Sequence, residues 1–385
     1  MTSRRLFGVA ERLKPFVVPV LLVVLAGLLY RSKIEREMVD FQVYRVAAAR
    51  ARAGEPLYRP DDGHYQFKYL PAFALAMAPF ATLEPDAAKT IWFAMSVGLL
   101  TAYIRWAVRA LPERRRSEPV LIWLTVILMA KFYGHELTLG QTNVLLGTLL
   151  VAALLAVQVD RPEIAGALIG LAAFVKPYAL LLLPWIGLTY GVSAAGACLG
   201  VIAVGLVAPA AIYGWRGNAA LLAAWWRTVS DSTAPNLLVS DNISLAAMWT
   251  KWIGPGRLTT VLTGLSSAAA LGLAVGVWLR RRAVDAPDYL EVALLMLLVP
   301  LLSPQGWDYV LLLATPAVIC LTDRWPEMSI EWRAVVAAAL ALMSLTLFDV
   351  MGRALYGRFM ALSIVSVAAL CLAGALARLR WIALA

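Results

Sequence analysis

Long apolar runs recur along the whole of this 385-residue chain, and they constrain its fold more than any other feature. A run of about 20 apolar residues is enough to cross the hydrocarbon core of a bilayer as a helix. The mean hydropathy is +0.75, and charged residues make up 15% of the sequence, against about 25% in a soluble domain. Barrel strands alternate polar and apolar residues, and these runs do not. The sequence therefore predicts an all-α, polytopic transmembrane helical bundle.

Candidate segments follow from the apolar runs. The run "FKYLPAFALAMAPFATLEP" is short and contains Pro71 and Pro79, so we expect its 67–82 part to lie at the interface or only partly enter the membrane. About twelve spans then remain. The candidate segments are 16–30, 67–82, 87–109, 119–133, 142–158, 162–175, 177–190, 193–213, 258–280, 289–302, 306–322, 332–348 and 358–377.

The distribution of arginine predicts the orientation. Cytoplasmic connections carry an excess of Lys and Arg, so we place the basic clusters inside, together with both termini. The net charge of +10 comes largely from such short connections, which does not favour nucleic-acid binding. We expect one membrane domain, 1–385, with a catalytic module at 1–213 that contains a first outward loop at 31–66. A second outward loop at 214–257 and C-terminal helices at 258–385 complete it. The clusters are Arg114–Arg116, Arg280–Arg282, Arg324, and Arg378 with Arg380.

Asp40 begins the segment "DFQVYRVAAARARAGEP", which follows the first apolar run. Apolar residues at helical spacing predict an amphipathic helix over 41–53 that lies on the outer leaflet and ends at Gly54. Asp40 could simply cap this helix. Alternatively, it could act as a general base above a membrane cavity. The apolar face consists of Phe41, Tyr44, Ala48 and Ala51.

Polar residues interrupt the apolar runs at four further connections. They are costly at membrane depth and usually face a cavity or a partner, although snorkelling or helix capping would also explain several of them. Lys176 stands at the helix break "FVKPYALL", where an ammonium facing a cavity would suit a phosphate. The other candidates are His135, Glu136, Gln141 and Asn143 in "GHELTLGQTN", Asn242 in "SDNISLAAM", and Asp308 and Tyr309 in "LLSPQGWDYVLLL".

Six short segments, in order, carry a family resemblance: "DFQVYRVAAARARAGEPLY", "FKYLPAFALAMAPFATL", "GQTNVLLGTLLVAAL", "EIAGALIGLAAFVKPYALLLLP", "DNISLAAM" and "LLSPQGWDYVLLL". On these, the chain resembles the polyprenol-phosphate-sugar-dependent glycosyltransferases of family 87, with the GT-C fold. The resemblance implies that Asp40 matches the catalytic aspartate and Lys176 the donor-phosphate lysine. It also exposes two departures, because Tyr309 stands where a histidine is expected and Ile243 where a glutamine is expected.

The resemblance implies a membrane transferase that moves a sugar, with mannose as the expected one, from a polyprenyl-phosphate donor to a glycolipid or polysaccharide on the outer face. A single base implies single displacement with inversion. Asp40 would take the acceptor proton, and Lys176 with Arg45 would stabilise the leaving phosphate. We expect no cofactor and no metal. A transporter or lipid flippase, or more weakly a scaffold, would also place polar residues in the membrane, but no internal repeat is evident in the sequence.

Overall fold

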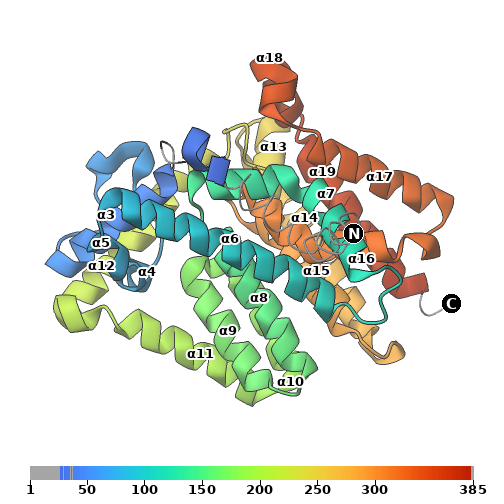
Figure 1. Ribbon diagram of the computed structural model, residues 1–385, viewed down its shortest axis with the longest axis horizontal. Helices are drawn as coiled ribbons and strands as arrows, with labels where there is room; N and C mark the ends of the chain where they lie inside the picture. The colour runs from blue at the N-terminus through green and yellow to red at the C-terminus, as the bar shows by residue number, and fades with distance from the viewer. Residues whose placement is uncertain (1–26, 29, 35, 37, 383–385) are drawn as a thin grey trace, which may run out of the picture.

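The computed structural model describes residues 27–28, 30–34, 36 and 38–382 (Figure 1). This part of the chain consists of helices and connecting loops and contains no β-strand, which confirms the all-α prediction. Almost all of the expected first span, 16–30, lies outside the described residues. The helices are η1 (Tyr30–Ile34), α3 (Val39–Ala53), η2 (Pro60–Tyr65), α4 (Pro71–Ala76), α5 (Ala78–Ala81), α6 (Pro85–Ala110), α7 (Glu118–Leu139), α8 (Asn143–Gln158), α9 (Pro162–Val175), η3 (Pro177–Leu182), α10 (Leu183–Tyr190), α11 (Val192–Val207), α12 (Ala210–Asn236), α13 (Leu245–Ile253), α14 (Arg257–Leu279), η4 (Arg281–Ala283), α15 (Asp288–Leu302), η5 (Asp308–Ala314), α16 (Thr315–Asp323), η6 (Trp325–Glu327), α17 (Ile330–Ser344), α18 (Phe348–Ala361) and α19 (Ile364–Ile382).

Four helices in the described residues are long and apolar enough to cross a membrane, and up to six if each of two bent pairs is one span. The four are Pro85–Ala110, Glu118–Leu139, Arg257–Ala283 and Ile364–Trp381, and the bent pairs are α11 with α12 and α17 with α18. The count of about twelve spans stays a prediction. The run at 67–82 forms α4 and α5, which have six and four residues and are too short to cross a bilayer.

Two apolar cores hold the bundle together. The larger core runs from α6 through α11 and from α13 to α19. In it, α9 packs between α8 and α11, as Figure 1 shows. The smaller core lies where α3 packs on α4, on α5 and on the start of α6, and Leu221 of α12 completes it. The apolar face of α3 is therefore buried against protein and is not available to lipid. The position of α3 at the outer leaflet stays a prediction.

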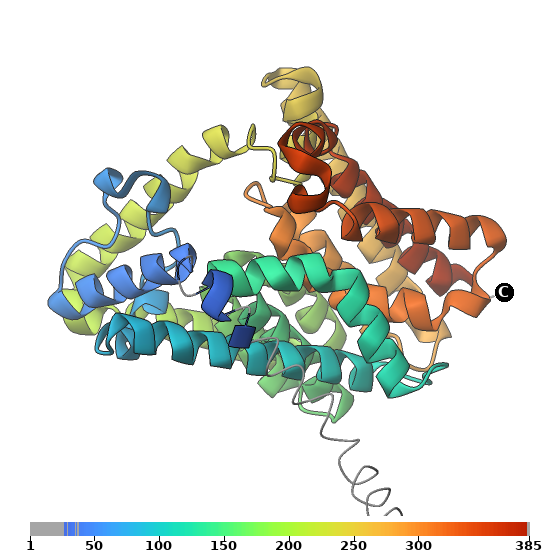
Figure 2. The same cartoon turned by 45° about the horizontal axis from the view of Figure 1, so that its top comes forward.

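The expected second outward loop, 214–257, is mostly helical. A kink at Gly214, with φ of 65°, bends the chain within α12, and α13 follows. The hydroxyl of Tyr213 donates to the carbonyl of Glu55 at 2.8 Å, and the indole of Trp225 donates to the carbonyl of Lys68 at 3.0 Å. These bonds attach the start and middle of α12 to the end of the first expected outward loop and to the segment that follows it. Beyond α12 the chain reaches α13 beside α18 (Figure 2), where the indole of Trp252 donates to the carbonyl of Leu362.

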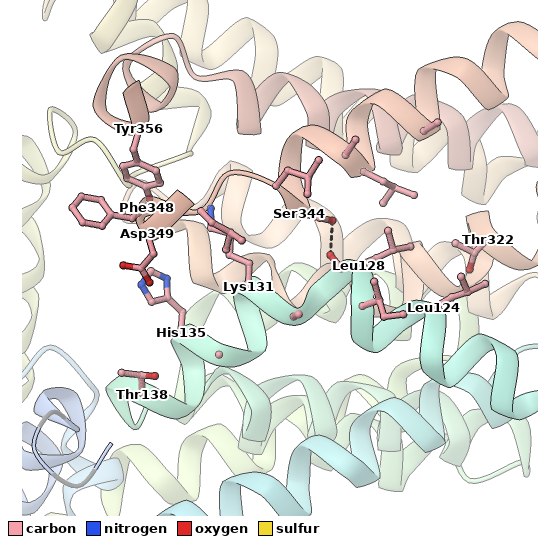
Figure 3. A pocket seen from close by; sticks show the side chains of 18 of the residues that line it. Leu124, Leu128, Lys131, His135, Thr138, Thr322, Ser344, Phe348, Asp349 and Tyr356 are labelled. Carbon is pink, nitrogen blue, oxygen red and sulfur yellow. Dashed lines mark hydrogen bonds between the residues drawn. The ribbon is translucent and has the colours of Figure 1, made fainter. Parts of the chain in front are cut away.

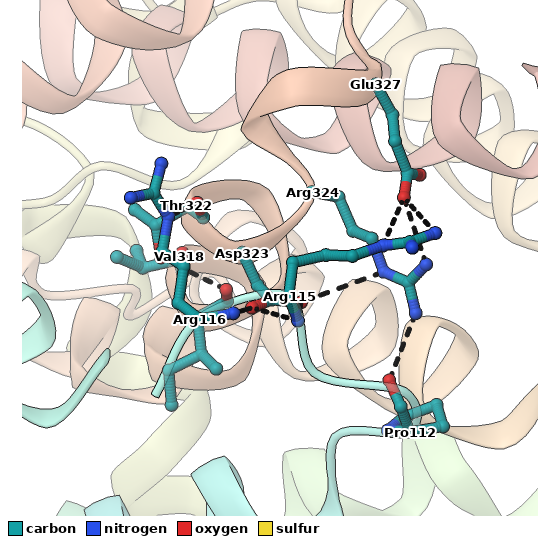
Figure 4. A network of polar contacts seen from close by, with 9 residues as sticks. Pro112, Arg115, Arg116, Val318, Thr322, Asp323, Arg324 and Glu327 are labelled. Atoms are coloured by element: carbon teal, nitrogen blue, oxygen red, sulfur yellow. Dashed lines mark hydrogen bonds and ion pairs between the residues drawn. The ribbon is translucent and has the colours of Figure 1, made fainter. Parts of the chain in front are cut away.

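The basic clusters gather at the end of the bundle where α7 begins. Asp323 is fully buried and accepts hydrogen bonds from the backbone N–H groups of Arg115 and Arg116 at 2.8–3.0 Å (Figure 4). A cavity of about 410 Å³ is lined by Arg115, Arg324 and Arg380. Most of the polar residues singled out in the sequence lie around the other end of α7. The 22 residues of α7 separate the two ends by about 33 Å.

Candidate functional site

Gly140 allows α3 to approach the end of α7. It has φ of 69° and ends the helix in the left-handed conformation that glycine adopts without strain. A Cβ at this position would lie 2.8 Å from Cβ of Phe41. The indole of Trp92 donates to the Gly140 carbonyl at 2.9 Å and stacks on Phe41. This close packing places the first turn of α3 directly beside Gln141.

Asp40 lies inside the first turn of α3 and does not cap it. The N-cap position is Met38, which makes no side-chain capping bond. The interpretation of Asp40 as the N-cap is therefore wrong. Oδ2 of Asp40 instead accepts a hydrogen bond from Nε2 of Gln141 at 2.6 Å. Among the described residues, no hydrogen bond to Oδ1 is seen.

Gln141 connects three segments that lie far apart in the sequence. Its Nε2 also donates to the hydroxyl of Tyr309 at 3.2 Å, and its Oε1 accepts from the hydroxyl of Tyr44 at 3.3 Å. Tyr44 is buried and shares a second hydrogen bond of 2.8 Å with Tyr69. Because both ends of the amide are engaged, its orientation is determined, and so is the donor that faces Asp40.

The surroundings of Asp40 shift its pKa in opposite directions. Burial raises the pKa of Asp40 above its ordinary value, while the hydrogen bond from Gln141 and the charge of Lys176 counter the rise. His64 and Lys68 also act in the lowering direction. Burial in turn lowers the pKa of Lys68. The result is a carboxylate that binds a proton more readily than a solvated aspartate does.

Lys176 lies at the junction of α9 and η3, as the sequence predicts for a helix break. The following proline cannot continue α9, and Lys176 itself adopts an extended conformation. The carboxylates that act on its ammonium group are those of Glu136 and Asp40. Its Nζ lies 5.8 Å from the centre of the Tyr309 ring. The structure thus brings Asp40, Gln141, Lys176 and Tyr309 into one cluster.

Glu136 and Asn143 lie next to this cluster and are hydrogen-bonded to each other. Glu136 is fully buried, and its two carboxylate oxygens accept hydrogen bonds from the side-chain amide of Asn143 and from the backbone N–H of Val144, both at 2.7 Å. A carboxylate at the first turn of α8 also complements the helix dipole. Glu136 therefore caps α8 by accepting from the N–H of Val144, and it joins α7 to α8.

Asn242 holds two connections together instead of facing an open site. It is fully buried, and its Nδ2 donates to the carbonyls of Asn236 and Pro304 at 3.0 and 2.8 Å. Its Oδ1 accepts from the backbone N–H of Ser244. The neighbouring Ile243 is also buried, and its N–H donates to the carbonyl of Gly306 at 2.7 Å. The hydrogen bonds of Asn242 and Ile243 to Pro304 and Gly306 therefore hold the backbone that precedes Tyr309.

Asp308 finds its partner in Lys131, a residue that the sequence analysis overlooked. Asp308 is fully buried, and its Oδ2 lies 2.9 Å from Nζ of Lys131. Nδ1 of His135, one helical turn further along α7, lies 3.8 Å from Oδ1 of Asp308. The sequence does contain a signal for this pair, because Lys131 lies within the apolar segment 119–133 and a lysine at membrane depth requires an anionic partner.

Among the described residues, Arg45 forms no hydrogen bond or ion pair with the cluster of Asp40, Gln141, Lys176 and Tyr309. Its Nε is buried and has no hydrogen-bond partner among them. The pairing of Arg45 with the donor phosphate therefore stays a prediction. In the described part of the chain, no group of three or more His, Cys, Asp or Glu residues is placed to hold a metal ion.

Comparison with protein-family models gives one match, to glycosyltransferase family 87, over residues 67–304. No curated protein and no solved structure matches the chain. The matched region is more than half of the chain and includes Gln141, Lys176 and Asn242. Asp40, Asp308 and Tyr309 lie outside it, and the structure shows how they approach it. The match confirms the family expected from the short motifs, and the chain is a member of glycosyltransferase family 87.

Proposed function

We propose that this membrane glycosyltransferase moves a sugar, with mannose as the first candidate, from a polyprenyl-phosphate donor to an acceptor on the outer face. The observation that supports the proposal is that Asp40 accepts a hydrogen bond from Gln141 and lies within the electrostatic influence of Lys176. A carboxylate from a loop helix and an ammonium from a helix break share one polar cluster within an otherwise apolar chain. Base and cation are the two groups that displacement of a phosphate from an anomeric carbon requires.

Asp40 acts as the general base. Its raised pKa makes it a better proton acceptor than a solvated carboxylate, and Gln141 holds it in position. As the acceptor oxygen attacks the anomeric carbon, the hydroxyl proton passes to Asp40. The bond from the anomeric carbon to the phosphate oxygen breaks on the opposite side of that carbon. One displacement inverts the anomeric configuration, and polyprenyl phosphate leaves with the electron pair.

Lys176 stabilises the leaving group. Negative charge develops on the phosphate as it departs, and a cation already present in a poorly solvated site stabilises that charge without reorganisation. The Tyr309 ring beside Nζ and the two neighbouring carboxylates keep the ammonium near the base. Arg45 on α3 could supply a second cation once substrate is bound.

The test is the substitution Asp40→Asn, which keeps the size of the side chain. We expect transfer of labelled mannose from polyprenyl-phosphate mannose in reconstituted membranes to fall by about 10²–10⁴, the usual contribution of a positioned general base. Donor binding should be retained, because the phosphate contacts lie at Lys176. Asp61→Asn is the matched control, since Asp61 is an exposed carboxylate in the same loop. Near-normal transfer by Asp40→Asn would exclude Asp40 as the base.

A further inference from the structure

A cavity of about 1130 Å³ extends along α7 on the side that faces α17 and α18 (Figure 3). Thr322 lies at one end of its lining, and His135 and Phe348 lie at the other end. The Thr322 end is the one at which α7 begins, about 33 Å of helix away from the turn that contains Gln141. The middle of the cavity is apolar, with a lining that includes Leu124, Ile127, Leu128, Leu340, Ala341 and Leu345.

The apolar middle of the cavity is open to its surroundings. Ile127 is 66% exposed, and Ala337 and Ala341 are exposed on α17. Because α7 is long and apolar enough to cross a membrane, this opening faces lipid when α7 is in a bilayer. An apolar groove beside a spanning helix is suited to a hydrocarbon chain that enters sideways from the bilayer.

The end at which α7 begins carries positive charge without an anionic partner. Arg116 lines the cavity there, together with Thr322 and Trp325. Its guanidinium donates from Nε to the carbonyl of Thr322 at 2.9 Å. Within the described part of the chain, Arg116 forms no ion pair, and no carboxylate lines this end of the cavity. The two terminal nitrogens of Arg116 are therefore available to an anion.

A second guanidinium is held by the same turn of the chain. Nε of Arg333 donates to the carbonyl of Trp325 at 3.0 Å, and one of its terminal nitrogens donates to the carbonyl of Pro326 at 2.7 Å. No ion pair of Arg333 is seen in the described ranges. The backbone between α16 and α17 thus binds two arginines through neutral carbonyls, which leaves both of their charges uncompensated.

The carboxylates nearest to this end of the cavity are already engaged. Asp323 accepts from the backbone N–H groups of Arg115 and Arg116 (Figure 4). Glu327 pairs with Arg115 at 2.8 Å and with Arg324 at 3.1 Å. An anion that neutralises Arg116 therefore has to come from outside the described residues.

We propose that this cavity is a binding site for an anionic phospholipid. One acyl chain lies in the apolar groove along α7, and the phosphate lies at Arg116 with Arg333 nearby. Guanidinium groups bind phosphate oxygens through paired N–H donors, and basic pockets between membrane helices bind anionic head groups. We expect the arginine clusters in the cytoplasm, so the phospholipid belongs to the cytoplasmic leaflet. The site is separate from the proposed active site and does not rest on the proposed function.

The test is photolabelling of the full-length protein in phosphatidylcholine nanodiscs that contain phosphatidylglycerol with a diazirine at the end of one acyl chain. We expect labelled peptides within 120–131 of α7 and 337–345 of α17. Arg116→Gln should reduce this labelling by about tenfold, as for loss of one charge-assisted contact, while the backbone N–H of residue 116 still binds Asp323. Arg282→Gln is the matched control, because Arg282 is exposed in a neighbouring arginine cluster and does not line the cavity.

A second pair of variants tests the groove itself. Ala341→Trp places a large ring in the groove and should also reduce the labelling. Ala338→Trp should not, because Ala338 is exposed on the same helix and does not line the cavity. Labelling confined to other helices would overturn the proposal, and so would equal labelling of Arg116→Gln and Arg282→Gln or of the two tryptophan variants.

Competition identifies the kind of ligand. Unlabelled phosphatidylglycerol should displace the probe, whereas glycerol phosphate, which has the same head-group chemistry without acyl chains, should not. Displacement by glycerol phosphate would indicate a site for a soluble phosphate. Displacement by undecaprenyl phosphate but not by phosphatidylglycerol would assign the groove to a polyprenyl chain. Either result would overturn the proposal.

Discussion

Gln141 donates a hydrogen bond to Asp40 over a distance of 2.6 Å, although 101 positions separate the two residues in the chain. The bond joins the loop helix α3 to the turn between α7 and α8. It exists because Gly140 has no side chain, so Phe41 can pack directly on that turn. One amide therefore positions the proposed base and partly counters the rise in its pKa that burial causes.

The activity should depend on pH through Asp40. Its pKa is raised by burial, and only the ionised carboxylate accepts a proton, so kcat/KM should fall as the pH drops through a value above 3.8. Gln141→Met removes the hydrogen bond that stabilises the ionised form. The acidic limb of the profile should then move to higher pH. The measurement is kcat/KM for sugar transfer against pH. An unchanged or lowered midpoint in Gln141→Met would contradict this arrangement.

Lys176→Ala should weaken use of the polyprenyl-phosphate donor. Loss of one charge-assisted contact costs about 1.5–3 kcal/mol, which corresponds to a rise of about 10- to 150-fold in the donor KM or Kd. Arg52→Ala is the control, because Arg52 is an exposed cation on α3. Donor titration of both variants in nanodiscs measures the effect. If the two variants match the wild type, Lys176 only reaches toward the membrane surface.

Asn242→Ala should destabilise the fold. The substitution leaves buried carbonyl and N–H groups without partners, at about 1–3 kcal/mol for each unsatisfied group. Asn236→Ala is the comparison, because Nδ2 of Asn236 has no hydrogen-bond partner among the described residues. Thermal unfolding midpoints of the two variants give the result. A smaller decrease for Asn242→Ala than for Asn236→Ala would argue against its role in joining the two connections.

Single cysteines should report the orientation in the membrane. We expect Asp61→Cys and Leu238→Cys to react with an impermeant thiol reagent in intact cells and Ser117→Cys to react only after lysis, because the arginine clusters predict a cytoplasmic start of α7. All three positions are exposed. Of the three native cysteines, Cys198 and Cys320 are buried and Cys371 is partly exposed, so Cys371 is replaced by serine before labelling. Labelling of Ser117→Cys in intact cells would reverse the orientation.

Sequence by itself determined the helical class, the membrane character, the family and the break at Lys176. These properties depend on hydrophobicity and on local backbone preferences, which short stretches of sequence carry. The end of α3 at Gly54 and the shortness of the 67–82 run follow from the same local rules. The family motifs also identified Asp40 and Gln141 as candidates, but not as partners.

Only the tertiary structure decided what each polar residue contacts. Asp40 accepts from Gln141 where a local rule favoured a helix cap, the apolar face of α3 is buried against protein, and Asp308 pairs with Lys131. Asn242 and Glu136 have their polar groups engaged in joining backbone segments. These outcomes depend on which helices pack together. A buried polar group binds whatever partner that packing places beside it, because leaving it unpaired costs more than any local preference provides.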